Sequence, residues 1–326
     1  MNPQDPIPYA PNPHQDNPRW PAWLPAVVIA LVSVAVFWPS LQGEFLNWDD
    51  ELYLTGHDNY RGLDWQHIRW MFTTTHGGPY QPLGWLSWAL DYRLWGLNAK
   101  GFKLSNLLLH AMTAGLLYLL ALRLLRPGLT LEASRPSPAL QLGACAAALL
   151  FALHPLRAES VAWATERRDV LSGLFYVLSV LLYVRWCQRR VVPSTGRASG
   201  WPAGAFVAFL CALLSKGMSV SLPFVLLILD VYPLRRVRVS FAPDSPLIAG
   251  RLSRVIVEKI PFLLCSAAIA VLAVHGVREV GALNPLQDIS VVERVVLSTY
   301  SSWFYLLKTI WPAHLSPLYE YPVKLD

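Results

Sequence analysis

Residues 20–43 read WPAWLPAVVIALVSVAVFWPSLQG and carry no charged side chain over 24 positions. Four further uncharged runs of 18 to 21 residues lie at 104–122, 136–156, 198–215 and 260–277. An α-helix needs about 20 apolar residues to cross the hydrocarbon core of a bilayer. All five runs are therefore long enough to span a membrane.

The composition of the whole chain agrees with this pattern. Of its 326 residues, 54% are hydrophobic and 15% are charged, whereas soluble domains carry about 25% charged residues. A soluble globular protein is excluded, and so is a disordered chain, which requires low hydrophobicity. The sequence indicates an all-α polytopic integral membrane protein.

We expect about eight membrane-spanning helices, with further helices lying in the membrane interface within the first outer loop. The spans are predicted at about 22–42, 104–122, 138–156, 170–187, 202–216, 218–234, 260–277 and 295–312. Residues 1–21 are rich in Pro and Asn and are expected to form a disordered cytoplasmic tail, leaving 22–326 as the membrane domain. Asp230, near the end of the sixth predicted span, is tolerable at a membrane interface.

The charges of the loops predict the orientation. With a cytoplasmic N-terminus, the connections 123–135, 185–197 and 235–259 face the cytoplasm and carry 13 Lys/Arg and three acids over 51 residues. The outer connections carry 11 Lys/Arg and 13 acids over 91 residues. The higher basic density on the cytoplasmic side satisfies the positive-inside rule. The first outer loop is then formed by residues 43–103.

The cysteines and the excess of basic residues point to no further class of function. Cys145, Cys187, Cys211 and Cys265 lie in or beside apolar segments without a CxxC pair, so we interpret them as apolar fillers rather than as disulfides or a metal site. The basic residues sit at the ends of spans rather than among aromatics on a soluble face. No nucleic-acid partner is expected.

The first outer loop opens with Asn47-Trp48-Asp49-Asp50-Glu51, which places three carboxylates in a row directly after the first span. Asp49 or Asp50 is suited to act as a general base toward an acceptor hydroxyl, or to hold a divalent cation. The alternative is a solvated loop entry or a helix N-cap, since Asp before Glu-Leu-Tyr-Leu suits capping.

Further along this loop, residues 82–95 place four aromatic side chains at helical spacing: Trp85, Trp88, Tyr92 and Trp95. Such a face is typical of a helix lying in the membrane interface, or of a cavity wall for a lipid-borne substrate. Asp91 and Arg93 are then expected to point toward the headgroups or an aqueous cavity.

The second outer connection, 157–169, combines acids with an arginine pair. On a helix, Glu159, Trp163 and Glu166 share one face. Arg167 and Arg168 lie where the fourth span begins and could grip a phosphate in bidentate fashion, or serve as interfacial anchors.

Two further polar residues lie in or beside spans. The short third outer turn holds Lys216 at the membrane surface, either as a phosphate ligand or as a cation at a helix C-terminus. His110, inside the second span, is interpreted as hydrogen-bonded between helices rather than catalytic.

These motifs occur together in one known group. In chain order they are Asn47-Trp-Asp-Asp-Glu, Pro82-Leu-Gly-Trp-Leu-Ser with Leu90-Asp-Tyr, Ser105-Asn-Leu-Leu-Leu-His-Ala, His154-Pro-Leu-Arg-Ala-Glu-Ser-Val-Ala-Trp with Glu166-Arg-Arg-Asp, and Ser215-Lys-Gly. Over about residues 25–320, the chain resembles the bacterial relatives of the transmembrane, tetratricopeptide-repeat-containing O-mannosyltransferases of the GT-C glycosyltransferase superfamily.

The resemblance implies a GT-C-like helical bundle in the bacterial inner membrane. It would move a mannose-like sugar from a polyprenyl-phosphate donor to a hydroxyl acceptor, such as protein Ser or Thr, on the outer face. The acid that acts as base maps to Asp49 or Asp50, and we favour Asp49 as the nearer to the first span. Residues that would line the site or bind the lipid phosphate are Glu159, Arg167, Arg168, Asp169 and Lys216, with Asp91 and Arg93 as further candidates.

Several points stay open. Some enzymes of this superfamily use Mg²⁺ or Mn²⁺ and others do not, so the metal is undecided. The relatives continue into further spans and repeats, and we therefore expect the membrane domain to be incomplete at its C-terminus. The alternative functions are a transporter or flippase for a lipid-linked substrate and a non-catalytic membrane scaffold. Transport sites usually place ionisable groups at mid-membrane in matched halves, which this sequence lacks.

Overall fold

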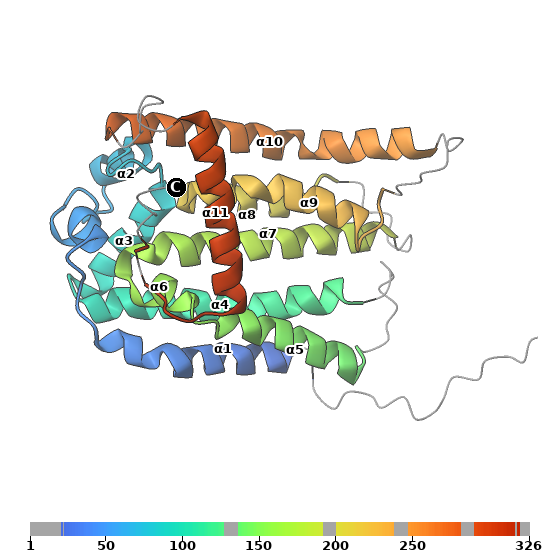
Figure 1. Ribbon diagram of the computed structural model, residues 1–326, viewed down its shortest axis with the longest axis horizontal. Coiled ribbons are helices and arrows are strands. Elements are labelled where there is room, and N and C mark those ends of the chain that lie inside the picture. Colours follow the sequence, from blue (N-terminus) through green and yellow to red (C-terminus); the bar gives the residue numbers. More distant parts are fainter. Residues whose placement is uncertain are drawn as a thin grey trace, which may run out of the picture.

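The computed structural model describes residues 21, 23–126, 136–191, 200–237, 247–281, 290–316 and 318–319, and every regular element in these ranges is a helix. The long helices lie side by side in a bundle (Figure 1). They are α1 (Trp23–Phe37), α4 (Ala99–Leu124), α5 (Pro138–Ala152), α7 (Arg167–Val191), α8 (Ala203–Ser215), α9 (Leu222–Val231) and α10 (Leu247–Glu279). The expected tail at 1–21 falls outside the described residues, except for Pro21.

Short helices gather at one end of this bundle, which we call the loop end (Figure 1). They are η2 (Glu51–Thr55), α2 (Trp65–Thr73), α3 (Pro82–Trp95), α6 (Arg157–Ala162) and η3 (Ala164–Glu166). The 3-10 helices η1 (Trp38–Gln42) and η5 (Gly217–Ser221) connect the long helices to this end. The loop end is therefore built from the connections that the sequence assigns to one side of the membrane.

Four helical segments of the described chain are long and apolar enough to cross a membrane: Trp23–Gln42, Ala99–Leu124, Ala164–Arg189 and Leu252–Glu279. They coincide with the first, second, fourth and seventh predicted spans. Three shorter apolar helices, Pro138–Ala152, Ala203–Ser215 and Gly217–Val231, fall at the third, fifth and sixth. An integral membrane protein of helical architecture is confirmed, whereas only four of the eight predicted spans reach the length and hydropathy of a span.

The eighth predicted span corresponds to α11 (Val291–Ile310), which differs from the rest. Its axis runs across those of the long helices (Figure 1). None of its residues is buried, and His154 Nε2 lies 2.9 Å from Thr309 O near its end. Its charges at Glu293, Arg294 and Lys308 leave only a short apolar stretch, which explains why it does not qualify as a span.

Small residues allow the first helices of the bundle to approach closely. Ala26 of α1 and Ala114 of α4 are buried together, and a Cβ atom on Gly115 would lie only 3.2 Å from Ala26 O. Ala144 and Ala148 of α5 belong to the same cluster. Close contact between helix backbones through small residues is typical of packing within a membrane, where dispersion contacts must replace the hydrophobic effect.

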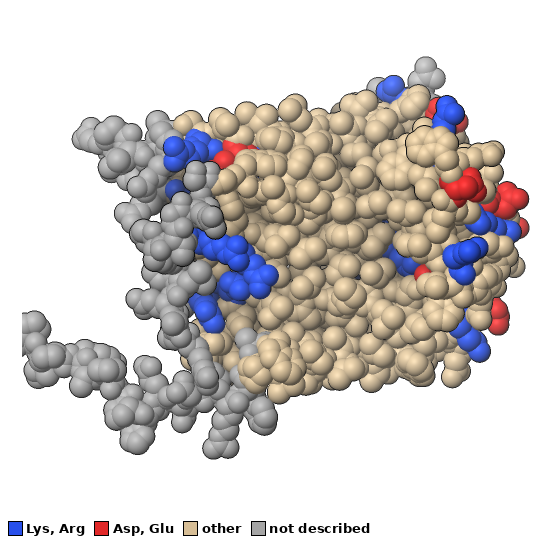
Figure 2. Space-filling view, turned by 180° about the vertical axis from the view of Figure 1, so that it is seen from behind, with Lys and Arg blue, Asp and Glu red and all other residues tan. Residues whose placement is uncertain are grey.

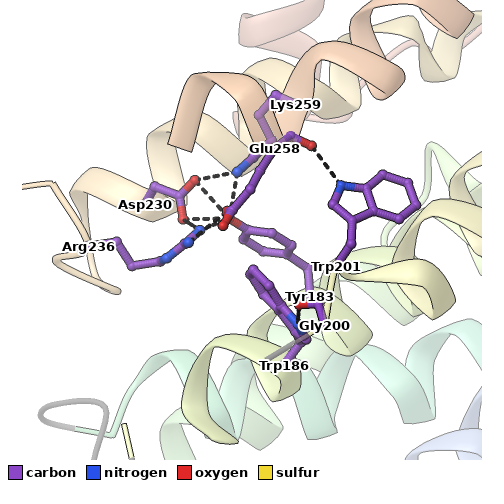
Figure 3. Close-up of polar contacts among 8 residues, drawn as sticks. All are labelled: Tyr183, Trp186, Gly200, Trp201, Asp230, Arg236, Glu258 and Lys259. Carbon is purple, nitrogen blue, oxygen red and sulfur yellow. Dashed lines mark hydrogen bonds and ion pairs between the residues drawn. The ribbon is translucent and has the colours of Figure 1, made fainter. Parts of the chain in front are cut away.

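At the end opposite to the loop end, α7, α9 and α10 are joined by buried charges (Figure 3). Asp230 is fully buried and accepts hydrogen bonds from the Tyr183 hydroxyl at 2.6 Å, Lys259 Nζ at 2.7 Å and Arg236 at 3.0 Å. Arg236 also pairs with Glu258 at 2.7 Å. We call these five residues the Asp230 clamp. They explain how the sixth predicted span tolerates an acid, because its charge is matched by two cations.

Asp230→Asn is expected to lower the free energy of unfolding by about 3–5 kcal/mol, because it leaves the buried Lys259 without its carboxylate partner. Thermal unfolding of the purified protein in neutral detergent, followed by circular dichroism, measures the change. The exposed Arg254→Gln on α10 is the control and is expected to change stability by less than about 0.5 kcal/mol. Equal melting temperatures for the two variants would show that the Asp230 clamp does not stabilise the fold.

Candidate active site at the loop end

Three stretches that are far apart in the sequence meet at the loop end. Arg168 Nη2 lies 2.7 Å from Asp49 Oδ2 and 3.1 Å from Glu166 Oε1. Lys216 Nζ lies 3.3 Å from Glu166 Oε2 and 2.5 Å from Asp169 Oδ1. Acids and bases thus alternate along one line, Asp49–Arg168–Glu166–Lys216–Asp169, which we call the ion-pair chain. Four of the predicted site residues belong to it, together with Glu166.

The two ends of the ion-pair chain are its accessible parts. The side chains of Asp49 and Asp169 are 33% and 35% exposed, whereas those of Arg168 and Glu166 are each 10% exposed. Three carboxylates against two cations leave one formal negative charge. The ion-pair chain therefore exposes carboxylate oxygens of Asp49 and Asp169, which their partner cations hold in place. This arrangement is suited to accepting a proton or binding a cation.

Asp50 has a different environment from its neighbour. It is fully buried and accepts hydrogen bonds from the backbone N–H groups of Leu46 at 2.9 Å and Thr165 at 3.0 Å. Burial raises the pKa of the Asp50 carboxyl, while the two backbone hydrogen bonds act to lower it. The stability that this group contributes is therefore greatest below its ordinary pKa and falls as the pH rises through the raised value. Through these hydrogen bonds Asp50 holds the first loop against η3, directly before α7.

Adjacent residues Arg167 and Arg168 point to different partners. Arg167 is buried and donates to Asp91 of α3, to Asn106 Oδ1 at 2.5 Å and to Phe102 O at 2.7 Å. Burial raises the pKa of Asp91, and the Arg167 charge opposes this. Arg167 therefore anchors α7 to α3 and α4. Arg93 is exposed and lies apart, beside Arg61 and Asp64.

Of the aromatic face predicted for residues 82–95, Trp85 and Trp88 turn inward, whereas Trp95 is 44% exposed. Trp85 and Trp88 are fully buried and pack against Tyr53 with ring centroids 5.7 and 6.0 Å apart. The Arg168 guanidinium lies 5.1 Å from the centre of the Tyr53 ring. Helical spacing correctly groups Trp85, Trp88 and Tyr92, which belong to or pack against one apolar cluster. Residues 44–80 fold over Trp85 and Trp88 and shield them. These rings pack against Tyr53, over which Arg168 of the ion-pair chain lies.

A cavity of about 590 Å³ adjoins this region, between η1, the start of α4 and α6 on one side and α11 with the residues that follow it on the other. Most of its lining is apolar, with Lys103 and Glu159 as its charged residues. Lys103 Nζ donates to Glu44 O at 2.9 Å, and a Cβ atom on Gly43 would lie 2.6 Å from that nitrogen. Glycine at position 43 thus leaves room for the lysine. Burial, and secondarily the Glu166 charge, raise the pKa of Glu159.

A smaller cavity of about 210 Å³ reaches the other end of the ion-pair chain, between His110, Arg157 and Asp169. His110 Nε2 lies 2.9 Å from Ala152 O, which confirms the predicted hydrogen bond between helices. Within the described ranges, no three His, Cys, Asp or Glu side chains are grouped as a metal site would require, and the four cysteines are free thiols. The predicted choice between a metal-dependent and a metal-independent site stays open.

Comparison with known proteins places the chain beside one group of enzymes. It is 30% identical to protein O-mannosyl-transferase TMTC2 of Homo sapiens over 220 residues, which are 65% of this chain and 24% of the relative. It is 31% identical to the TMTC2 protein of Xenopus laevis over 62% of this chain and 23% of the relative. It is 32% identical to protein O-mannosyl-transferase TMTC4 of Mus musculus over 60% of this chain and 26% of the relative.

These similarities confirm the resemblance to the O-mannosyltransferases. The chain spans about a quarter of the length of the curated relatives it matches. No family model matches it, and no solved structure matches it significantly.

Two residues at the site were not identified from the sequence. Lys103 occupies the last position before the second uncharged run, where a lysine is indistinguishable from an ordinary interfacial anchor. Tyr53 follows the acidic stretch, and only the folding of the loop brings its ring beneath Arg168. The contact between Lys103 and the Glu44 carbonyl oxygen has no local sequence signal, because 59 residues separate the two.

The two neighbouring acids are expected to respond differently to amidation. Asp50→Asn places an NH₂ group against a buried backbone N–H and is expected to lower the free energy of unfolding by about 1–3 kcal/mol. Asp49→Asn loses a partly exposed ion pair and is expected to cost less than about 1 kcal/mol. Urea unfolding in neutral detergent compares them, and a less stable Asp49 variant would reverse this assignment.

Proposed function

We propose that this chain is a membrane glycosyltransferase that moves a mannose-like sugar from a polyprenyl-phosphate donor to a hydroxyl group, such as that of a protein Ser or Thr, on the outer side of the membrane. The observation that carries the proposal is the partly exposed Asp49 carboxylate, which Arg168 fixes at the loop end. The names of the relatives, all O-mannosyl-transferases, support the reaction type.

In the proposed reaction, Asp49 accepts the proton of the acceptor hydroxyl. The hydroxyl oxygen forms a bond to the anomeric carbon of the sugar, and the bond from that carbon to the phosphate oxygen breaks. The lipid phosphate departs with the electron pair. Positioning of the two substrates supplies most of the acceleration, and the carboxylate removes the proton as the new bond forms. Arg168 holds the Asp49 carboxylate in place through a 2.7 Å ion pair.

The basic side chains have different roles in binding the sugar donor and in holding the site together. Arg168 and Lys216 each contact two carboxylates, so they hold the acids in place and supply positive charge around the departing phosphate. Arg167 is enclosed by α3 and α4 and acts by anchoring α7. Lys103 is the basic residue that lines the larger cavity. We assign the prenyl chain to this apolar cavity and the lipid phosphate to Lys103.

Transfer itself is tested with polyprenyl-phosphate mannose and a peptide-library acceptor, using the purified chain in lipid nanodiscs. We expect hexose-modified peptide with the wild type and its loss in Asp49→Asn, while the melting temperature changes little because the pair is partly exposed. Assays with chelator, Mg²⁺ and Mn²⁺ decide the metal requirement. Movement of intact donor between leaflets without cleavage would indicate a flippase instead, and neither activity would indicate a scaffold.

Donor binding tests the assignment of Lys103. Lys103→Met removes the charged donor facing the cavity and is expected to raise the KM for the donor about tenfold to a hundredfold, with a smaller change in kcat. Lys100→Met is the matched control, because Lys100 lies on the same helix and is exposed. The assignment fails if both variants show the same KM.

A further inference from the structure

A second group of basic side chains lies at the opposite end of the bundle from the candidate active site. Figure 2 shows Lys and Arg side chains gathered at this end, on the face seen from behind. Arg123 lies in the last turn of α4 and Arg126 directly after this helix, while Arg185 and Arg189 lie near the end of α7. Arg123 is close enough to the other three for mutual electrostatic repulsion. We call these four residues the arginine cluster.

Little negative charge offsets the positive charges of the arginine cluster. No acidic side chain in the described part of the chain forms an ion pair with any of its members. Arg123 donates to the buried Gln188 amide at 2.8 Å, which fixes one guanidinium. The mutual repulsion of these cations favours a bound anion.

Exposed apolar side chains lie beside the arginine cluster, and they suit a lipid ligand better than a soluble anion. Leu125 and Leu142 are 48% and 72% exposed. A Cβ atom on Gly143 would lie 3.6 Å from Leu125 Cδ1, so the ends of α4 and α5 are in contact beside the cluster. An apolar surface directly next to guanidinium groups matches a molecule with acyl chains beside a phosphodiester. Basic pockets between membrane helices bind such headgroups.

We propose that the arginine cluster binds the headgroup of an anionic phospholipid in the leaflet opposite to the candidate active site. Guanidinium groups from α4 and α7 hold the phosphodiester oxygens, and the acyl chains lie along Leu125 and Leu142. The positive-inside rule by itself places arginines at these helix ends without requiring that they share a ligand. The proposal differs from that rule in predicting saturable, headgroup-selective binding.

The test uses the full chain purified in a neutral detergent. It is titrated with a short-chain phosphatidylglycerol, with phosphatidylcholine of the same acyl chains, and with glycerol phosphate as the free headgroup. We expect saturable binding of phosphatidylglycerol at least tenfold tighter than either of the others. The binding weakens as salt is added, because the contacts are electrostatic.

R126Q/R189Q removes one guanidinium from each helix end and is expected to weaken phosphatidylglycerol binding about thirtyfold, since each basic residue near the headgroup contributes about fivefold. R235Q/R254Q removes two exposed arginines outside the cluster and is expected to leave the affinity unchanged. If the double variant does not fold, R189Q alone, at an exposed position of α7, is expected to show about a fivefold loss.

Three results would overturn the proposal. Equal affinity in the cluster variant and the control variant would show that these arginines do not form the site. Equal binding of phosphatidylcholine would remove the role of the charge. Binding of glycerol phosphate as tight as that of phosphatidylglycerol would identify a site for a soluble phosphate instead of a lipid.

Discussion

The buried pair of Arg167 and Asp91 is the interaction on which the loop end depends. A guanidinium cannot be buried in an apolar bundle unless its charge and its N–H groups are satisfied. Arg167 meets this requirement through Asp91, Asn106 Oδ1 and the carbonyl oxygen of Phe102. Since these partners belong to α3 and α4, one side chain fixes the first residue of α7 against two other helices.

Once Arg167 is fixed, the position of Arg168 follows from helix geometry, because successive residues point about 100° apart around a helix. Arg168 therefore turns from Asp91 toward the first loop, where it contacts Asp49 and lies over the Tyr53 ring, and it also pairs with Glu166 of η3. Asp50 is buried by the same arrangement and holds the loop by two backbone hydrogen bonds. Buried Arg167 and Asp50 thus position their neighbours Arg168 and Asp49, to which we assign roles in the proposed reaction.

Charge and hydropathy predicted much of this architecture, since the cost of burying charge governs where helices can cross a membrane. The uncharged runs located the helices, and the acids at 49 and 50 and the bases at 168 and 216 do meet at one end. The sequence could not separate Asp49 from Asp50 or Arg167 from Arg168, because their roles depend on partners more than 50 residues away. For the same reason it offered the membrane interface or a cavity wall for Trp85 and Trp88, whereas a folded loop buries both. The Asp230 clamp shows a similar limit, since Lys259 and Tyr183 lie on other helices.

The central claim is that Asp49, held by Arg168, is the base for sugar transfer from a lipid phosphate. It is tested most directly by single-turnover transfer in nanodiscs, comparing wild type with Asp49→Asn and Asp49→Glu at equal bound donor. We expect donor to bind equally to all three, the Asn variant to form no glycosylated peptide, and the Glu variant to retain part of the activity. Full transfer by the Asn variant, or loss of donor binding in it, would show that Asp49 is not the base.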